Sequence, residues 1–171
     1  MCTVCGSWGR SNKVVASNVP EVANLGIVRP PVVYLSAIAL GLLLHLVWPL
    51  RLAPAAVGVP LGTIAVLVAV ALFLYAVRTL RIADTPVPGN RPTTTIVRTG
   101  PFRFSRNPIY LSFSLLLLGV AFLVNSWWLL ATLALAVALM SFVVIPREER
   151  YLERRFPSEY LPYNASVRRW L

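Results

Sequence analysis

Metal-ligating side chains are scarce in this sequence, and their scarcity excludes several classes of protein. Cys2, Cys5 and His45 are its only cysteines and histidine, whereas a structural zinc site uses about four such ligands. We therefore expect no metal site. Cys2 and Cys5 form a lone C-x-x-C without a surrounding strand and helix pattern, so an unstructured tail is the simpler interpretation and a redox pair is the alternative.

Charged residues are also few. They make up 13% of the chain, against about 25% in typical soluble domains, while 57% of the residues are hydrophobic and the mean hydropathy is +0.71. This composition predicts an integral membrane protein. The formal net charge of +10 comes almost entirely from arginine, because Lys13 is the one lysine. The arginines flank apolar runs and form no continuous stripe, so we expect no nucleic-acid partner.

Four apolar runs predict an all-α integral membrane protein with four transmembrane helices, the last two forming a tight hairpin. The first run has 20 residues without a formal charge, about the length that crosses a hydrocarbon core of ~30 Å. The third is about 24 Å long as a helix, short for a span. We expect spans at about 31–50, 57–77, 109–124 and 127–145, in a membrane domain of residues 30–171 that follows a polar tail at 1–29.

The distribution of basic residues predicts the orientation. With four spans and the N-terminus inside, 15 of the 16 basic residues fall on the cytoplasmic side, as the positive-inside rule requires. We therefore expect both termini, the loop 78–108 and the tail 146–171 to be cytoplasmic, with an amphipathic surface helix in the tail. The preference for arginine over lysine and the Ala and Val richness suit a bacterial inner membrane protein from a GC-rich genome.

Two polar stretches flank the hairpin and carry the residues suited to chemistry. Residues 100–110 read GPFRFSRNPIY, and residues 147–163 read REERYLERRFPSEYLPY. The hairpin between them returns its two ends to the same membrane face. The sequence therefore predicts one site, at which the arginine-rich stretch meets Glu148 and Glu149.

These stretches resemble the membrane methyltransferases related to isoprenylcysteine carboxyl methyltransferase and the phospholipid methyltransferases. That family has G-x-[YF]-x-x-x-R-[HN]-P-x-Y, then paired glutamates, then F-G-x-E-Y-x-x-Y. The resemblance implies a cytoplasmic S-adenosylmethionine pocket, closed by the C-terminal segment and open to the bilayer between helices. It implies catalytic roles for Arg106 and Glu148, and cofactor binding by Thr94, Thr95, Ile96, Val97, Phe102, Asn107, Pro108, Tyr110, Glu148 and Glu149.

The chemistry fits this resemblance. The cofactor is a sulfonium cation with an ammonium and a carboxylate, which carboxylate, arginine and aromatic side chains can bind. Methyl transfer needs positioning and exclusion of water more than a strong base, and the lack of a catalytic histidine weakens hydrolase interpretations. The implied acceptor is a lipidic or small hydrophobic molecule that enters from the bilayer and bears a carboxylate, thiol or amine.

The sequence departs from the family at three places. Asn107 stands where many members have histidine, Pro157 replaces a glycine, and residues 143–145 are apolar where prenylcysteine enzymes place an arginine for the substrate carboxyl. A prenylcysteine carboxylate is therefore not a secure substrate.

Other interpretations of the same residues stay open. The arginines could simply orient the protein, Glu148 and Glu149 could begin a solvated helix, and Tyr160 and Tyr163 could only pack the tail. We interpret His45 as an interhelical hydrogen-bonding group, with a functional role as the alternative. The alternative functions are a membrane reductase using NADPH, which would need a larger chain, and a non-catalytic membrane scaffold.

Overall fold

The computed structural model describes residues 29–86 and 93–171, and within these ranges it contains helices and no strand. This confirms the all-α class. The expectations for the polar tail and for Cys2 and Cys5 fall on residues 1–28, outside the described part. The elements are α1 (Pro30–Val47), α2 (Ala55–Ile82), the 3-10 turn η2 (Gly100–Arg103), α3 (Pro108–Val124), α4 (Trp127–Leu139), the π-helical turn η3 (Met140–Val144), α5 (Ile145–Arg155) and α6 (Pro157–Ser166).

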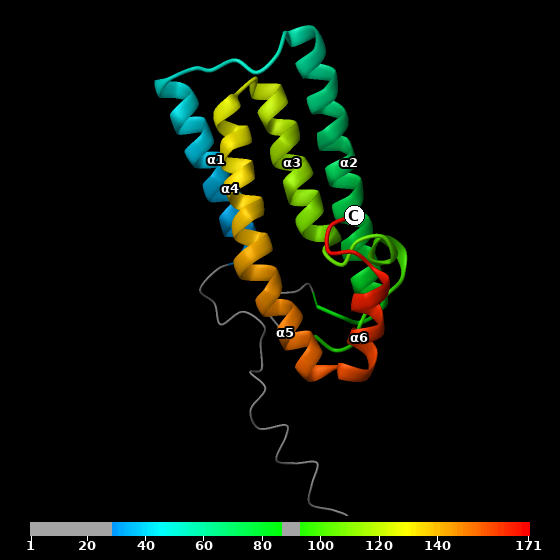
Figure 1. The fold of residues 1–171 in the computed structure, drawn as a ribbon. Coiled ribbons are helices and arrows are strands. Elements are labelled where there is room, and N and C mark those ends of the chain that lie inside the picture. The colour runs from blue at the N-terminus through cyan, green and yellow to red at the C-terminus, as the bar shows by residue number, and fades with distance from the viewer. Residues whose placement is uncertain (1–28, 87–92) are drawn as a thin grey trace, which may run out of the picture.

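The long helices have the lengths and composition of membrane spans. Three helical stretches are long and apolar enough to cross a bilayer: α1, α2 and the continuous helix Trp127–Arg155 that joins α4, η3 and α5. α3 is shorter, with 17 residues. The four apolar helices stand side by side, and α5 continues the line of α4 before α6 turns back (Figure 1). Many large apolar side chains on these helices are exposed, as lipid contact requires; Leu46 is 79% exposed and Leu35 65%.

Small residues bring α2 and α3 into close contact. A Cβ atom added at Gly62 of α2 would lie 2.8 Å from the carbonyl oxygen of Gly119 on α3, and one added at Gly119 would lie 2.7 Å from Val66. Gly41 of α1 allows the same close approach to Leu129 of α4. Such contacts are a main source of helix association in a bilayer, where the hydrophobic effect does not drive helices together.

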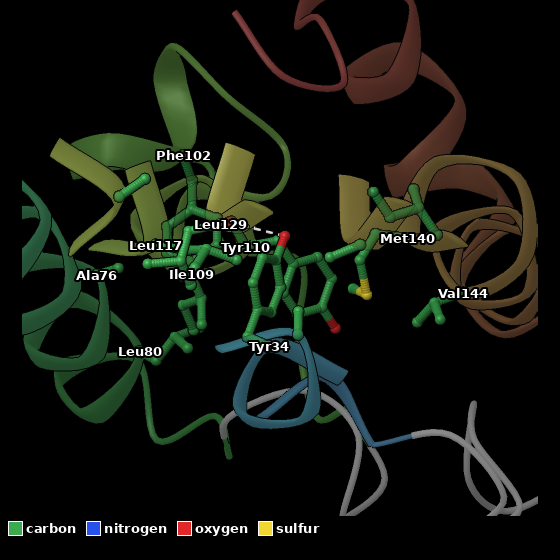
Figure 2. Packing of buried hydrophobic residues seen from close by; sticks show 14 residues of the cluster. Tyr34, Ala76, Leu80, Phe102, Ile109, Tyr110, Leu117, Leu129, Met140 and Val144 are labelled. Carbon is green, nitrogen blue, oxygen red and sulfur yellow. Dashed lines mark hydrogen bonds between the residues drawn. The ribbon is translucent and has the colours of Figure 1, made fainter. Parts of the chain in front are cut away.

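The core lies where these helices meet residues 100–107, the stretch before α3 that carries the first motif and that we call the motif loop. Figure 2 shows Tyr34 of α1 and Tyr110 of α3 close together within the buried cluster, and the Tyr34 hydroxyl donates to the Tyr110 carbonyl oxygen at 3.3 Å. Leu117, Leu129 and Met140 are fully buried around them. His45 has a buried Nδ1 atom without a hydrogen-bond partner among the described residues. The interhelical hydrogen bond expected of His45 is therefore not formed at this atom.

Asn125 ties the two connections at the far end of the bundle together. Its backbone is left-handed, with φ of 59°, between α3 and α4. Its Oδ1 atom accepts from the N–H groups of Leu52 and Ala53 at 2.7 and 2.8 Å, and its Nδ2 atom donates to the Ala53 carbonyl at 2.8 Å. Nearby, the Trp128 indole donates to the Trp48 carbonyl at 2.7 Å. Asn125 therefore connects the turn between α3 and α4 to the loop between α1 and α2.

We predict that Asn125→Ala lowers the free energy of unfolding by about 2 to 4 kcal/mol, because it removes three hydrogen bonds and puts a Cβ-bearing residue without a local hydrogen bond in the left-handed region. Asn125→Gly removes the same bonds without the backbone strain and is expected to cost less. The apparent melting temperatures of the detergent-solubilised proteins measure both effects. An Asn125→Ala variant as stable as the wild type would show that these hydrogen bonds do not stabilise the fold.

Candidate active site

A widened helical turn precedes the site. The N–H of Ile145 donates to the carbonyl oxygen of Met140, five residues back, instead of to Ser141. Pro146 follows and has no N–H to donate. The Ser141 carbonyl therefore loses both of the helical donors that could reach it. Such π turns within α-helices occur frequently at functional sites, and this one lies directly before Glu148.

The motif loop is held against the end of α2 by its glycine. Gly100 has φ of +60°, and a Cβ atom there would lie 2.8 Å from Thr79 Oγ1, so glycine suits both the conformation and the space. The η2 turn that begins at Gly100 buries Phe102. The Tyr163 hydroxyl of α6 donates to the Phe102 carbonyl at 2.8 Å. The loop is thereby fixed between α2 and α6.

A cavity opens between this loop and helices α5 and α6. It encloses about 750 Å³ of space not occupied by atoms, which includes open solvent at its mouth. Its wall comes from five parts of the chain that are distant in sequence: Leu80, Thr85, Thr93, Thr95, Ile96, Val97, Phe102, Arg106, Asn107, Glu148, Glu149, Tyr151, Leu152, Tyr160 and Tyr163.

Glu148 is the buried acidic group of this wall. Its side chain is 7% exposed, and the Tyr110 hydroxyl donates to its two oxygens at 2.7 and 2.8 Å. It lies three residues after Ile145, where the apolar part of the helix ends. Burial raises the pKa of Glu148 to about 7; the Tyr110 hydrogen bond opposes this rise and the charge of Glu149 adds to it. Glu148 therefore titrates near neutral pH.

Glu149 has a different environment from its neighbour. Its Oε1 atom lies 3.1 Å from Arg106 Nη1, and Arg169 binds both of its oxygens, Nε at 3.1 Å and Nη2 at 2.7 Å. Arg106 Nη1 also donates to Asn164 Oδ1, and lies 3.4 Å from the Tyr160 hydroxyl. Glu149 is thus ion-paired with two arginines.

Helix α6 closes the cavity with two tyrosines. Tyr160 and Tyr163 are 2% and 5% exposed, and their rings meet edge to face at 6.3 Å. Burial raises the pKa of each to about 12, so both hydroxyls stay protonated and can donate at neutral pH. The tail does not form the single surface helix expected from the sequence. The helix ends before Phe156, because Pro157 disfavours a helical conformation of the residue before it. The chain then folds back as α6.

The structure brings most of the expected site residues together. Eight of them line the main cavity, whereas Pro108 and Tyr110 line a smaller hollow of about 270 Å³ that shares Glu148 with it. Thr94 lines neither; its hydroxyl donates to the Asp84 carbonyl at 3.1 Å and lies 3.0 Å from Thr85 Oγ1. The catalytic and cofactor roles of these residues stay predictions.

Seven lining residues are absent from the sequence-based set. Leu80 and Thr85 come from the end of α2, where no motif marks them, and Thr93 lies one residue before the expected stretch. Tyr160 and Tyr163 belong to a motif that the sequence does show, so their place in the wall could have been inferred. Tyr151 and Leu152 complete the set from α5.

Comparison with known proteins identifies relatives for part of the chain. The model of the phospholipid methyltransferase family matches residues 57–159, more than half of the chain. The cobalt-zinc-cadmium resistance protein CzcN of Cupriavidus metallidurans is 40% identical over 73 residues, 43% of this chain and 33% of that protein. The nickel-cobalt-cadmium resistance protein NccN of Alcaligenes xylosoxydans xylosoxydans is 40% identical over 67 residues, 39% of this chain and 32% of that protein.

The chain thus spans about a third of the length of these curated relatives. No solved structure matches it.

We predict that the stability of the protein falls as pH rises from about 4.5 to about 7. The folded state holds the Glu148 proton up to about pH 7, whereas the unfolded chain releases it near the ordinary value, so the stabilisation is complete below that value and is lost above it. The slope is at most about 1.4 kcal/mol per pH unit. Apparent melting temperatures across this pH range measure it.

Glu148→Gln is expected to flatten this dependence, and Asp84→Asn, at an exposed position that does not line the cavity, is the matched control. An equal slope in wild type and Glu148→Gln would show that another group titrates.

Proposed function

Because this chain belongs to the phospholipid methyltransferase family, we propose that it transfers a methyl group from S-adenosylmethionine to a lipidic or small hydrophobic acceptor. The observation that carries the proposal is the buried Glu148, held by Tyr110 in the wall of a cavity beside the membrane spans. A buried acidic group with a strongly raised pKa, lying in the wall of a cavity, is typical of functional sites.

The lining of the cavity suits this cofactor. When bound, S-adenosylmethionine supplies an electrophilic methyl group on a positively charged sulfur. When ionised, Glu148 offers a negative charge in the cavity wall, and Glu149, the other lining glutamate, forms ion pairs with Arg106 and Arg169. The rings of Phe102 and Tyr160 can contact the cationic and aromatic parts of the cofactor, and the loop residues Thr95, Ile96 and Val97 offer backbone groups.

The charges around the cavity bear on the class of acceptor. A carboxylate acceptor would need a free cation, but Arg106, the one arginine among the described lining residues, is ion-paired with Glu149. An amine or thiol acceptor must instead lose a proton, and a carboxyl with a pKa near 7 is suited to take it. Among the three expected classes, the geometry therefore favours an amine or a thiol.

The orientation follows from the distribution of charge. The site lies at the end of the bundle that carries the loop after α2 and the helices after Ile145, which are rich in arginine. We place this end in the cytoplasm of a bacterium, with residues 30–171 as one domain in the inner membrane and both termini inside. The soluble cofactor then reaches the cavity from the cytoplasm, and the acceptor comes from the membrane lipids.

We predict that the protein purified in lipid nanodiscs binds S-adenosylmethionine saturably, and that Glu148→Gln weakens this binding by about tenfold or more, because a charge-assisted contact is lost. Isothermal titration calorimetry measures both affinities. Asp84→Asn, which changes an exposed carboxylate that does not line the cavity, is the control and is expected to bind like the wild type. A folded wild-type protein that binds no cofactor would overturn the proposed function and favour a scaffold or, if NADPH binds, a reductase.

We further predict that the product carries its methyl group on nitrogen or sulfur. Bacterial membranes incubated with the protein and methyl-labelled cofactor should yield labelled lipid that releases no volatile methanol in mild alkali, because an N-methyl or S-methyl bond survives where a methyl ester hydrolyses. Heat-inactivated protein serves as the control. Release of most of the label as methanol would instead identify a carboxylate acceptor.

A further inference from the structure

Residues 167–171 contact the elements that carry the site and do not line the cavity. The Arg106 N–H donates to the Arg168 carbonyl at 3.0 Å, and the Asn107 amide donates to the Arg169 carbonyl at 3.1 Å. The Trp170 indole donates to Ser141 Oγ at 3.2 Å. This segment therefore contacts both the R-N-P motif and the widened turn η3.

The side chain of Arg169 joins two elements that carry the site. Its Nε and Nη2 atoms bind the two oxygens of Glu149, and its Nη1 atom lies 3.4 Å from the Ser141 carbonyl oxygen. That carbonyl is the one that the π turn and Pro146 leave without a helical donor. One Arg169 side chain thus donates to the carbonyl oxygen that the widened turn leaves free, and also binds the carboxylate of Glu149. It does not line the cavity.

Electrostatic coupling links this contact to Glu148. The Tyr110 hydroxyl of α3 bonds Glu148 directly, and the other titratable or charged groups among the described residues of the cavity wall are Glu149 and Tyr151 on its own helix, Arg106 from the motif, and Tyr160 and Tyr163 from α6. The charge of Glu149 disfavours ionisation of Glu148. Arg106 and Arg169 are the cations that offset this charge: Arg106 contacts Oε1 of Glu149, and Arg169 contacts both of its oxygens.

We propose that Arg169 is a positioning residue of the methyl-transfer site: it holds Glu149 and the widened turn, and so keeps Glu148 in place and able to bind a cation. This inference rests on the proposed function, and it assigns Arg169 no contact with cofactor or acceptor, because Arg169 is not among the residues that line the cavity. A purely structural clamp would change stability alone. A positioning residue also changes the pH at which the site gains its affinity.

The expected effect has a defined sign. Ionised Glu148 binds the cationic cofactor, so affinity for S-adenosylmethionine rises with pH until Glu148 is fully ionised. In Arg169→Gln the charge of Glu149 is less well offset, which makes Glu148 harder to ionise and moves the midpoint of the affinity profile to higher pH. In Glu149→Gln the opposing charge is gone, and the midpoint moves to lower pH.

The test is calorimetric titration of the full chain in nanodiscs with S-adenosylmethionine between pH 5.5 and 8.5. We expect Arg169→Gln to raise the midpoint by about 0.5 to 1 pH unit, which corresponds to about a 3- to 10-fold loss of affinity below the midpoint. Arg169→Lys, which keeps the charge, is expected to recover most of the shift. Arg168→Gln is the matched control, because it removes an equal charge from an exposed side chain, and should leave the midpoint unchanged.

Two results would overturn the proposal: an unshifted midpoint in Arg169→Gln, or an equal shift in Arg168→Gln. In the Glu149→Gln background, Arg169→Gln should produce no further upward shift, and a full shift there would also contradict it. Should Arg169→Gln not fold, Arg169→Lys and Glu149→Gln still test the coupling.

The same experiments distinguish a failure of the proposed function from a failure of this inference. If the folded wild type binds no cofactor, the methyl-transfer proposal falls. The pH dependence of the melting temperature, which reports Glu148 without a ligand, then decides the coupling: an unchanged midpoint in Arg169→Gln overturns it.

Discussion

The hydrogen bond from Tyr110 to Glu148 is the contact on which the rest of the site depends. It joins the first turn of α3 to the helix that returns from the membrane, so it can form only when the hairpin is closed. A buried carboxylate at the end of a membrane span costs free energy without such a donor. The remaining features either position these two side chains, as Tyr34 does beneath Tyr110, or surround them with a cavity wall.

Prolines shape this end of the bundle by the hydrogen bonds that they cannot make. Pro108 begins α3 and thereby places Tyr110 in its first turn. Pro146 accompanies the widened turn that frees the Ser141 carbonyl for Arg169. Pro157 ends α5 and sends α6 back over the cavity. The backbone restrictions of these three prolines therefore fix where the apolar helices end and where the helices that line the site begin.

Much of the architecture could be predicted because the solvent imposes it. In a bilayer the backbone must satisfy its own hydrogen bonds, so long apolar runs become helices, and charged residues collect at their ends. The hairpin then brings its two flanking motifs to one face, and the family match agrees with the resemblance that these motifs carry. The directions of individual side chains could not be predicted from the sequence. Thr94 bonds to Asp84 and Thr85, whereas Thr95 beside it lines the cavity.

The sequence by itself determined the all-α membrane class, the arginine-rich end and the identity of the two motifs, because composition and local spacing suffice for these. Only the tertiary structure decided what the paired glutamates do. Neighbouring residues on a helix point about 100° apart, so Glu148 meets Tyr110 while Glu149 meets Arg106 and Arg169. Arg169 lies 20 residues from Glu149, and no local pattern connects them. Their pairing exists only because α6 reverses the chain.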